Sequence, residues 1–212
     1  LRNPLAPIRN ATALVCRTEL QPAARAACAI IERQVQMLSH LVDDLLDMSR
    51  ITAGRVRLQI EPLKLDTILA LSIESCRPAL EAAHHALEVQ HPEEPLWVRG
   101  DRVRLPQVFA NILSNAVKYT PAGGRIQVRL TRENDEAVVR ILDTGVGIPS
   151  PMLQTIFDLF VQVDRTYEST GGGLGIGLSL SKRLIQMQGG SIEAYSAGAG
   201  QGSEFTGRLP TI

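Results

Sequence analysis

The sequence lacks a net charge, any closely spaced cysteines and any long apolar run. Its 22 basic and 22 acidic side chains cancel, so there is no basic surplus of the kind that binds nucleic acid or membrane surfaces non-specifically. No apolar run approaches the ~18–20 residues of a membrane-spanning helix, and no signal peptide is recognisable. We therefore expect no nucleic-acid partner and no direct membrane insertion.

The three cysteines, Cys16, Cys28 and Cys76, are scattered without the spacing of a metal site. They fit buried thiols in a reducing compartment better than a disulfide framework, which predicts a cytoplasmic location. The 212 residues are 44% hydrophobic, which is enough for one packed domain or two small ones. Because the first residue is Leu and not Met, we expect the chain to be a piece of a longer protein.

Residues 1–54 predict two helices joined by a turn. In the first helix, apolar residues recur at intervals of three and four, and Pro4 and Pro7 predict a kink near its start. The turn is expected over residues 19–22, because the residue before a proline avoids helical geometry.

The second helix is predicted by a seam that repeats every seven positions. The seam consists of Ile31, Leu38, Leu45 and Thr52, with Gln34, Leu41 and Met48 between them. Gly54 is expected to end this helix. Such a seam is buried either by packing on the following domain or by pairing with a second copy in a dimeric four-helix bundle, and we favour the dimer.

Beyond residue 54 the pattern changes to short strands and helices. Strands are predicted over residues 55–60, 86–90, 96–99, 125–131, 137–142, 191–195 and 202–209. Helices are predicted over 65–83, 101–119 and 175–188, with Asp66 and Asp101 as N-caps and Val103 on an apolar face. The predicted fold class is α+β: an N-terminal helical hairpin followed by a sandwich with helices on one face of a mixed sheet.

Four groups of residues have the composition of a binding site, and the first lies on a predicted helix. Asn111 and Asn115 are four residues apart, so they share one helix face. Amide oxygens suit Mg²⁺, and Lys118 is close enough in sequence to reach a phosphate. An exposed polar helix face explains the asparagine pair equally well.

The second group follows a predicted strand directly. Asp143 is followed by Gly145 and Gly147, which is typical either of a plain turn or of backbone that approaches a ligand closely. A carboxylate at this place can accept a hydrogen bond from the exocyclic amine of adenine. Taken alone, the plain turn is the more common explanation.

The third and fourth groups come later in the chain. Phe157 and Phe160 are two of only four phenylalanines, although ordinary core aromatics explain them better when they are taken alone. Residues 170–178 are glycine-rich and precede a predicted helix, whose free N–H groups suit an anion. The match to a dinucleotide-binding motif is partial, and no Walker lysine follows. Residues 161–172 have the composition of a movable flap over a ligand.

In their order and spacing, these four groups are similar to known nucleotide-binding boxes. Residues 101–209 resemble the catalytic ATP-binding domain of bacterial sensor histidine kinases, within the wider GHKL ATPase family shared with gyrase, Hsp90 and MutL. Residues 1–8 resemble the end of the phosphoacceptor motif His-Glu-Leu-Arg-Asn-Pro-Leu. The resemblance implies a dimerisation and histidine phosphotransfer hairpin over residues 1–54 and a catalytic ATP-binding domain over 55–212.

The resemblance also implies ATP and Mg²⁺ as cofactors and gives roles to individual residues. Asn115 would hold Mg²⁺ with support from Asn111, and Lys118 would face the phosphates. Asp143 would accept a hydrogen bond from the adenine amino group. Phe157 would help to anchor the movable flap of residues 161–172. The implied nucleotide-binding set is Asn111, Asn115, Lys118, Tyr119, Asp143, Gly145, Gly147, Ile148, Phe160, Gly171, Gly172, Gly173, Leu174, Gly175 and Leu178.

One residue separates a kinase from an ATPase in this family. Hydrolysing relatives carry a glutamate at the position of Asn111, and an amide cannot take a proton from water at neutral pH. The resemblance therefore implies transfer of the ATP γ-phosphoryl group to a histidine and then to an aspartate on a response regulator. A dimeric nucleotide-binding module without transfer and a GHKL-type ATPase are the alternatives.

The phosphoacceptor histidine itself would stand two residues before Leu1. The four histidines, His40, His84, His85 and His91, match no such motif, so we expect the chain to bind ATP without phosphorylating itself. The catalytic residues implied are Asn111, Lys118 and Asn3. Asn3 matches a position that helps some relatives to dephosphorylate the regulator, although a plain helix-start residue is an equal alternative.

Overall fold

The computed structural model describes residue 8 and residues 11–12, 22–161 and 175–212. The first long element is the helix α2 (Pro22–Thr52), which confirms the second helix of the sequence prediction. Gly54 has a φ of +65° and ends α2 where expected, with the N–H of Arg55 bonded to the carbonyl of Arg50 at 2.8 Å. The first predicted helix lies outside the described residues except for Ile8, Ala11 and Thr12, and the predicted turn lies outside them except for Pro22.

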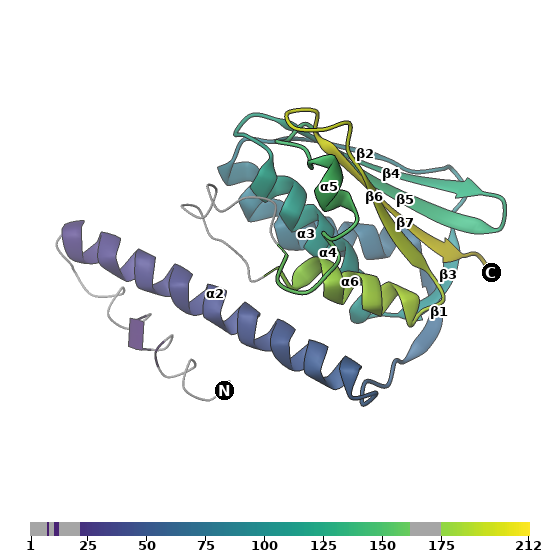
Figure 1. Ribbon diagram of the computed structural model, residues 1–212, viewed down its shortest axis with the longest axis horizontal. Helices are drawn as coiled ribbons and strands as arrows, with labels where there is room; N and C mark the ends of the chain where they lie inside the picture. Colours follow the sequence, from purple (N-terminus) through teal and green to yellow (C-terminus); the bar gives the residue numbers. More distant parts are fainter. Residues whose placement is uncertain (1–7, 9–10, 13–21, 162–174) are drawn as a thin grey trace.

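A five-stranded sheet forms the centre of the rest of the chain (Figure 1). Its strands, in spatial order, are β2 (Ala86–Gln90), β4 (Arg125–Glu133), β5 (Glu136–Asp143), β7 (Ser203–Pro210) and β6 (Ser191–Tyr195). β2 runs parallel to β4 and the other neighbouring pairs are antiparallel, so the sheet is mixed as predicted. β4 and β5 form the predicted hairpin.

Three helices cover one face of this sheet (Figure 1). They are α3 (Leu65–Ala82), α4 (Arg104–Tyr119) and α6 (Gly177–Gln186), and a short helix α5 (Ser150–Leu153) follows β5. α4 lies between α3 and α6, and its residues Leu105, Phe109 and Leu113 are fully buried. Because this apolar stripe is buried, the polar residues of α4 lie on the other sides of the helix.

The strand predicted over residues 55–60 is wrong, because the strand β1 spans Ile60–Lys64 instead. β1 pairs antiparallel with β3 (Trp97–Asp101) in a separate two-stranded sheet, and the pairing ends where Ile60 meets Asp101. Past Asp101 the chain turns toward α4, so the residues before Ile60 have no strand opposite them. The N–H of Gln59 is bonded instead to the Asp101 carboxylate at 2.8 Å.

Two predicted helix starts also need correction. α4 begins at Arg104 and not at Asp101, although the Asp101 carboxylate does accept the N–H groups of Val103 and Arg104 at 2.9 and 3.0 Å. Val103 is 72% exposed and does not belong to the apolar face. Asp66 is not an N-cap: Lys64 holds that position, and the N–H of Leu65 is bonded to the carbonyl of Leu96 at 3.0 Å.

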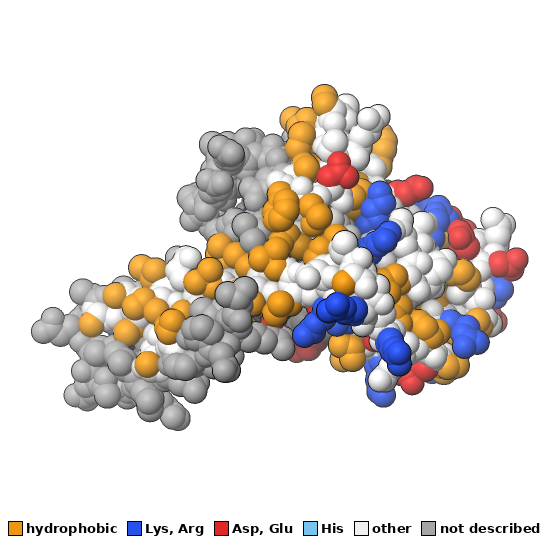
Figure 2. Space-filling view, turned by 60° about the horizontal axis from the view of Figure 1, so that its bottom comes forward, with side chains coloured by type: hydrophobic (Ala, Val, Ile, Leu, Met, Phe, Trp, Pro, Cys, Tyr) orange, Lys and Arg blue, Asp and Glu red, His pale blue; other side chains and the backbone are white. Residues whose placement is uncertain are grey.

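The surface of α2 is apolar over much of its length (Figure 2). Ile30, Ile31, Leu38 and Leu45 are exposed, whereas Ile51, near the end of the helix, is buried in the same hydrophobic core as α3, α4 and α6. The exposed part of the seam thus has no apolar partner among the described residues. No helix in the described part of the chain is both long and apolar enough to span a membrane.

Two of the cysteines are free thiols, as the sequence predicted. Cys28 and Cys76 are both buried, and burial raises the pKa of the Cys76 thiol. Cys16 lies outside the described residues.

Candidate functional site

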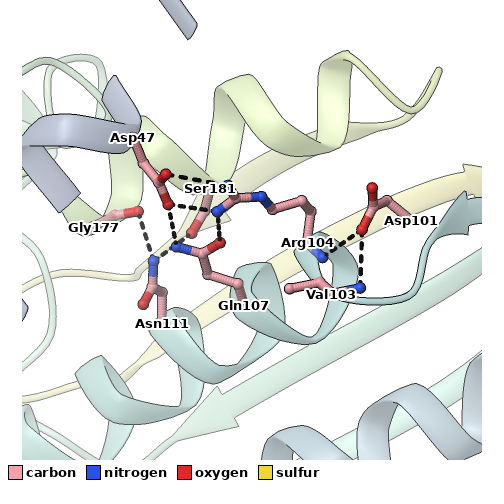
Figure 3. Close-up of polar contacts among 8 residues, drawn as sticks. All are labelled: Asp47, Asp101, Val103, Arg104, Gln107, Asn111, Gly177 and Ser181. Carbon is pink, nitrogen blue, oxygen red and sulfur yellow. Dashed lines mark hydrogen bonds and ion pairs between the residues drawn. The ribbon is translucent and has the colours of Figure 1, made fainter. Parts of the chain in front are cut away.

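The two asparagines of α4 have different surroundings. The amide nitrogen of Asn111 donates to the carbonyl of Gly177 and to the hydroxyl of Ser181, both at 3.3 Å, and so ties α4 to α6 (Figure 3). Asn115, one turn further along, is half-buried, and its side-chain amide makes no hydrogen bond to any residue that the structure describes. No described residue competes with a ligand for this amide, whereas the nitrogen of Asn111 is already in use.

The carboxylate of Asp143 is fixed at the end of β5. One oxygen accepts the N–H of Gly145 at 2.8 Å, and the other accepts the hydroxyl of Ser203 on β7. Each oxygen keeps lone-pair capacity for a further donor. The bonds from Gly145 and from Ser203 thus hold the Asp143 carboxylate, a hydrogen-bond acceptor, in one orientation.

The turn that follows Asp143 packs against the end of α4. The N–H of Val146 is bonded to the carbonyl of Tyr119 at 3.0 Å. A Cβ atom at Gly145 would lie 2.4 Å from that same carbonyl oxygen, so this approach requires glycine. Lys118 is half-buried, with its ammonium 4.8 Å from the centre of the Tyr119 ring. The asparagine helix and the Asp143 turn are therefore neighbours.

The two phenylalanines differ in burial. The Phe157 ring meets the Phe205 ring edge-on at 6.4 Å, and the ammonium of Lys182 on α6 lies 5.1 Å from its centre. Phe160 is 62% exposed, has a φ of +66°, and donates its N–H to the carbonyl of Gly175 at 3.1 Å. The phenylalanine segment is thus bound to the residues that lead into α6.

Gly175 is the described end of the glycine-rich segment. It has a φ of +69°, and a Cβ there would lie 2.6 Å from the carbonyl oxygen of Val161. Leu178, two residues into α6, packs against the core. The predicted site residues Gly171, Gly172, Gly173, Leu174 and Asn3 lie outside the described residues.

The contacts above bring the described members of all four groups together. α4 is bonded to α6 through Asn111 and to the Asp143 turn through Tyr119, and the phenylalanine segment is bonded to Gly175. Sequence reasoning did not single out Ser203, which donates to Asp143. Its position next to Asp143 across the β5–β7 ladder depends on strand register, which no local motif reveals.

A polar cluster on α4 lies one turn before Asn111 (Figure 3). The carboxylate of Asp47, on α2, accepts hydrogen bonds from both terminal nitrogens of Arg104. The amide nitrogen of Gln107 donates to the same carboxylate at 3.4 Å. The side chains of Asp47 and Arg104 are only 14% and 23% exposed. This bidentate ion pair holds α2 against α4, the helix that carries Asn111 and Asn115.

Comparison with protein families identifies both parts of the chain. Residues 1–54 match the family described as His Kinase A (phospho-acceptor) domain. Residues 100–212 match the family described as Histidine kinase-, DNA gyrase B-, and HSP90-like ATPase.

Two curated relatives illustrate the sequence similarity. The circadian input-output histidine kinase CikA of Synechococcus elongatus is 34% identical over 215 residues, which cover 99% of this chain and 28% of the relative. The sensor protein DivL of Caulobacter vibrioides is 34% identical over 211 residues, which cover 99% of this chain and 26% of the relative. The chain thus spans little more than a quarter of the length of these relatives.

Solved structures agree with the fold. Full-length ShkA in complex with AMPPNP matches with a TM-score of 0.81 at 25% identity, over 100% of this chain and 44% of that one. The histidine kinase AdeS of Acinetobacter baumannii matches with a TM-score of 0.70 over 98% of this chain and 93% of that one. Its identity of 22% makes this second match a likeness of fold alone.

Proposed function

The chain belongs to the sensor histidine kinase family, with its phosphoacceptor-type and GHKL ATPase-type segments in order, and from this premise we propose that it is an ATP-dependent protein-histidine kinase core of a two-component system. The observation that carries the proposal is the convergence of α4, the Asp143 turn and α6 on one site. The AMPPNP bound to the structural relative ShkA supports a nucleotide as the ligand.

Adenine would be recognised by the carboxylate of Asp143. Its two oxygens are oriented by Gly145 and Ser203, so it can accept a hydrogen bond from the adenine amino group without first being ordered. Gly145 and Gly147 let the turn pack closely against its neighbours, since a Cβ at these positions would lie 2.4 Å and 2.0 Å from the carbonyl oxygens of Tyr119 and Gly198. Lys118, at the end of α4, would face the phosphates.

Mg²⁺ fits the residues that are present. No group of three or more His, Cys, Asp or Glu in the described ranges is arranged to hold a metal, so the oxygens would come from amides, phosphates and water. Asn115 offers a half-buried amide without another partner among the described residues, and we propose it as the protein ligand. When bound, the ion would neutralise part of the charge on the triphosphate.

The site favours phosphoryl transfer over hydrolysis. Asn111 has no basic group, and its nitrogen is engaged with Gly177 and Ser181, so it cannot activate a water molecule. An imidazole needs little activation, because its neutral form already carries a lone pair. Bringing it to the γ-phosphate in line with the leaving oxygen would supply most of the rate.

The proposed acceptor is a histidine outside these 212 residues. None of the four histidines matches the phosphoacceptor motif: His40 lies on α2, and the other three lie in the catalytic domain. A response-regulator aspartate would then receive the phosphoryl group. The ATP requirement and the free thiols of Cys28 and Cys76 favour action in the cytoplasm.

Labelled ATP provides the test of this function. The chain as it stands should bind Mg·ATP, remain unlabelled and release no appreciable inorganic phosphate. An extended chain, in which a helical segment ending in His-Glu precedes Leu1, should acquire acid-labile phosphate, and Asn115→Ala should abolish that label. Binding without any label on the extended chain would favour the nucleotide-binding module. Steady hydrolysis by the unextended chain would favour the ATPase.

A further inference from the structure

The loop between β6 and β7, residues 196–202, packs against the turn that follows Asp143. The N–H of Gly200 is bonded to the carbonyl of Val146 at 2.6 Å, and the N–H of Gly202 to the carbonyl of Gly145 at 3.1 Å. The two segments are more than forty residues apart in sequence but form one backbone-to-backbone contact.

Glycines make this close contact possible. Gly147 has a φ of +71°, and a Cβ there would lie 2.0 Å from the carbonyl oxygen of Gly198. A Cβ at Gly202 would lie 2.0 Å from the carbonyl oxygen of Asp143. No side chain separates the loop from the turn at these points, so a small shift of the loop moves the turn directly.

A single buried hydroxyl joins the two segments. Ser196 is 6% exposed, and its oxygen donates to the carbonyl of Gly202 at 2.6 Å. The same oxygen accepts the N–H of Ile148 at 3.0 Å and that of Gly198 at 3.3 Å. One donated and two accepted bonds use the full capacity of a hydroxyl group. Without it, the buried N–H of Ile148 has no partner from this loop.

We propose that Ser196 is a positioning residue for adenine recognition, because it holds the turn from Asp143 to Ile148 in the shape that presents the carboxylate. This inference rests on the proposed nucleotide-binding function. Guanine carries a carbonyl oxygen where adenine carries its amino group, so a fixed carboxylate attracts adenine and repels guanine. Loosening the turn should therefore weaken discrimination between the bases.

The test compares the affinities for Mg·ADP and Mg·GDP by calorimetry. Ser196→Ala should lower the ratio of the ADP affinity to the GDP affinity about tenfold, mainly by weakening ADP binding. Ser196→Thr, which keeps the hydroxyl, should restore most of that ratio. Ser72→Ala is the matched control: Ser72 is a buried serine on α3 that bonds the carbonyls of Ile68 and Pro106. It should lower thermal stability and leave the ratio unchanged.

An unchanged ratio in Ser196→Ala, with the wild type preferring ADP, would overturn the inference and leave the proposed function intact. A wild type that binds neither nucleotide would instead remove the function on which it rests. If Ser196→Ala does not fold, amide hydrogen exchange in the wild type decides. The N–H of Ile148 should exchange slowly with and without Mg·ADP, because the Ser196 hydroxyl holds it. Fast exchange in both states would refute the proposed role of Ser196.

Discussion

In the proposed site, recognition of the base depends on Asp143, whose two oxygens are oriented by Gly145 and Ser203. Asp143→Asn should weaken ADP binding by at least about tenfold, because only one acceptor oxygen remains for both the surrounding protein groups and the adenine amino group, and the negative charge is lost. Displacement of a fluorescent ADP analogue measures this. Asp135→Asn is the control: the carbonyl of Asp135, in the β4–β5 turn, accepts two bonds from Thr211, and its carboxylate has no hydrogen bond to a described residue. Equal losses in the two variants would contradict the assignment.

Asp101 gives a prediction for pH. Burial of the Asp101 carboxylate opposes its ionisation, but the N–H groups of Gln59, Arg104 and Val103, with the charge of Arg104, lower its pKa below the usual 3.8. The folded state therefore binds this proton less readily than the unfolded state. The ionised Asp101 therefore stabilises the folded state fully at pH values above its pKa in the unfolded chain. This stabilisation is lost as the pH falls through its lower pKa in the folded chain.

Asp101→Asn should therefore lower the free energy of unfolding in urea by about 1 kcal/mol at neutral pH. The difference from wild type should shrink as the pH falls below about 4, where the Asp101 carboxylate of the unfolded chain begins to gain its proton. A difference that stays constant down to about pH 3 would show that the charge of Asp101 is not what stabilises the start of α4.

At the scale of elements, the contact of α2 with α4 depends on Asp47 and Arg104. Arg104→Ala should cost about 1–3 kcal/mol, because it leaves a largely buried carboxylate with less compensation. It should also speed amide hydrogen exchange over the last third of α2. Arg77→Ala, which breaks the exposed pair with Glu74, is the control and should change neither quantity measurably. Unchanged exchange in Arg104→Ala would mean that apolar contacts alone hold α2 in place.

The sequence predicted the elements of the central sheet and helices, because their alternation and helical periodicity are local properties. It misplaced β1 by five residues, because the extent of that strand depends on the distant Asp101. It also misassigned Asp66, whose place at the start of α3 is set by the carbonyl of Leu96 across the fold.

The same division applies to the candidate site. The Asn111, Asp143 and Gly175 groups were visible as local motifs. Ser203 and Ser196 were not, because each acts through a segment more than forty residues away. Their contribution follows from strand register and loop packing, which a single sequence does not reveal.

At the scale of the whole molecule, the exposed apolar seam on α2 predicts a dimer. Leu38→Glu, on the exposed seam, should convert a dimer into a monomer, because it places a charge where two apolar seams would meet. Light scattering coupled to gel filtration measures the mass. Leu71→Glu is the matched control, since Leu71 is an exposed leucine on α3, and its dimer should persist. Two variants of equal mass would contradict pairing through the seam.

The central claim is that α4, the Asp143 turn and the residues around α6 form one site for a magnesium nucleotide. Calorimetric titration of the wild-type chain with Mg·AMPPNP tests it most directly. We expect a saturable heat with one nucleotide bound per chain, lost when the magnesium is chelated. The absence of any heat of binding at millimolar nucleotide would contradict the account.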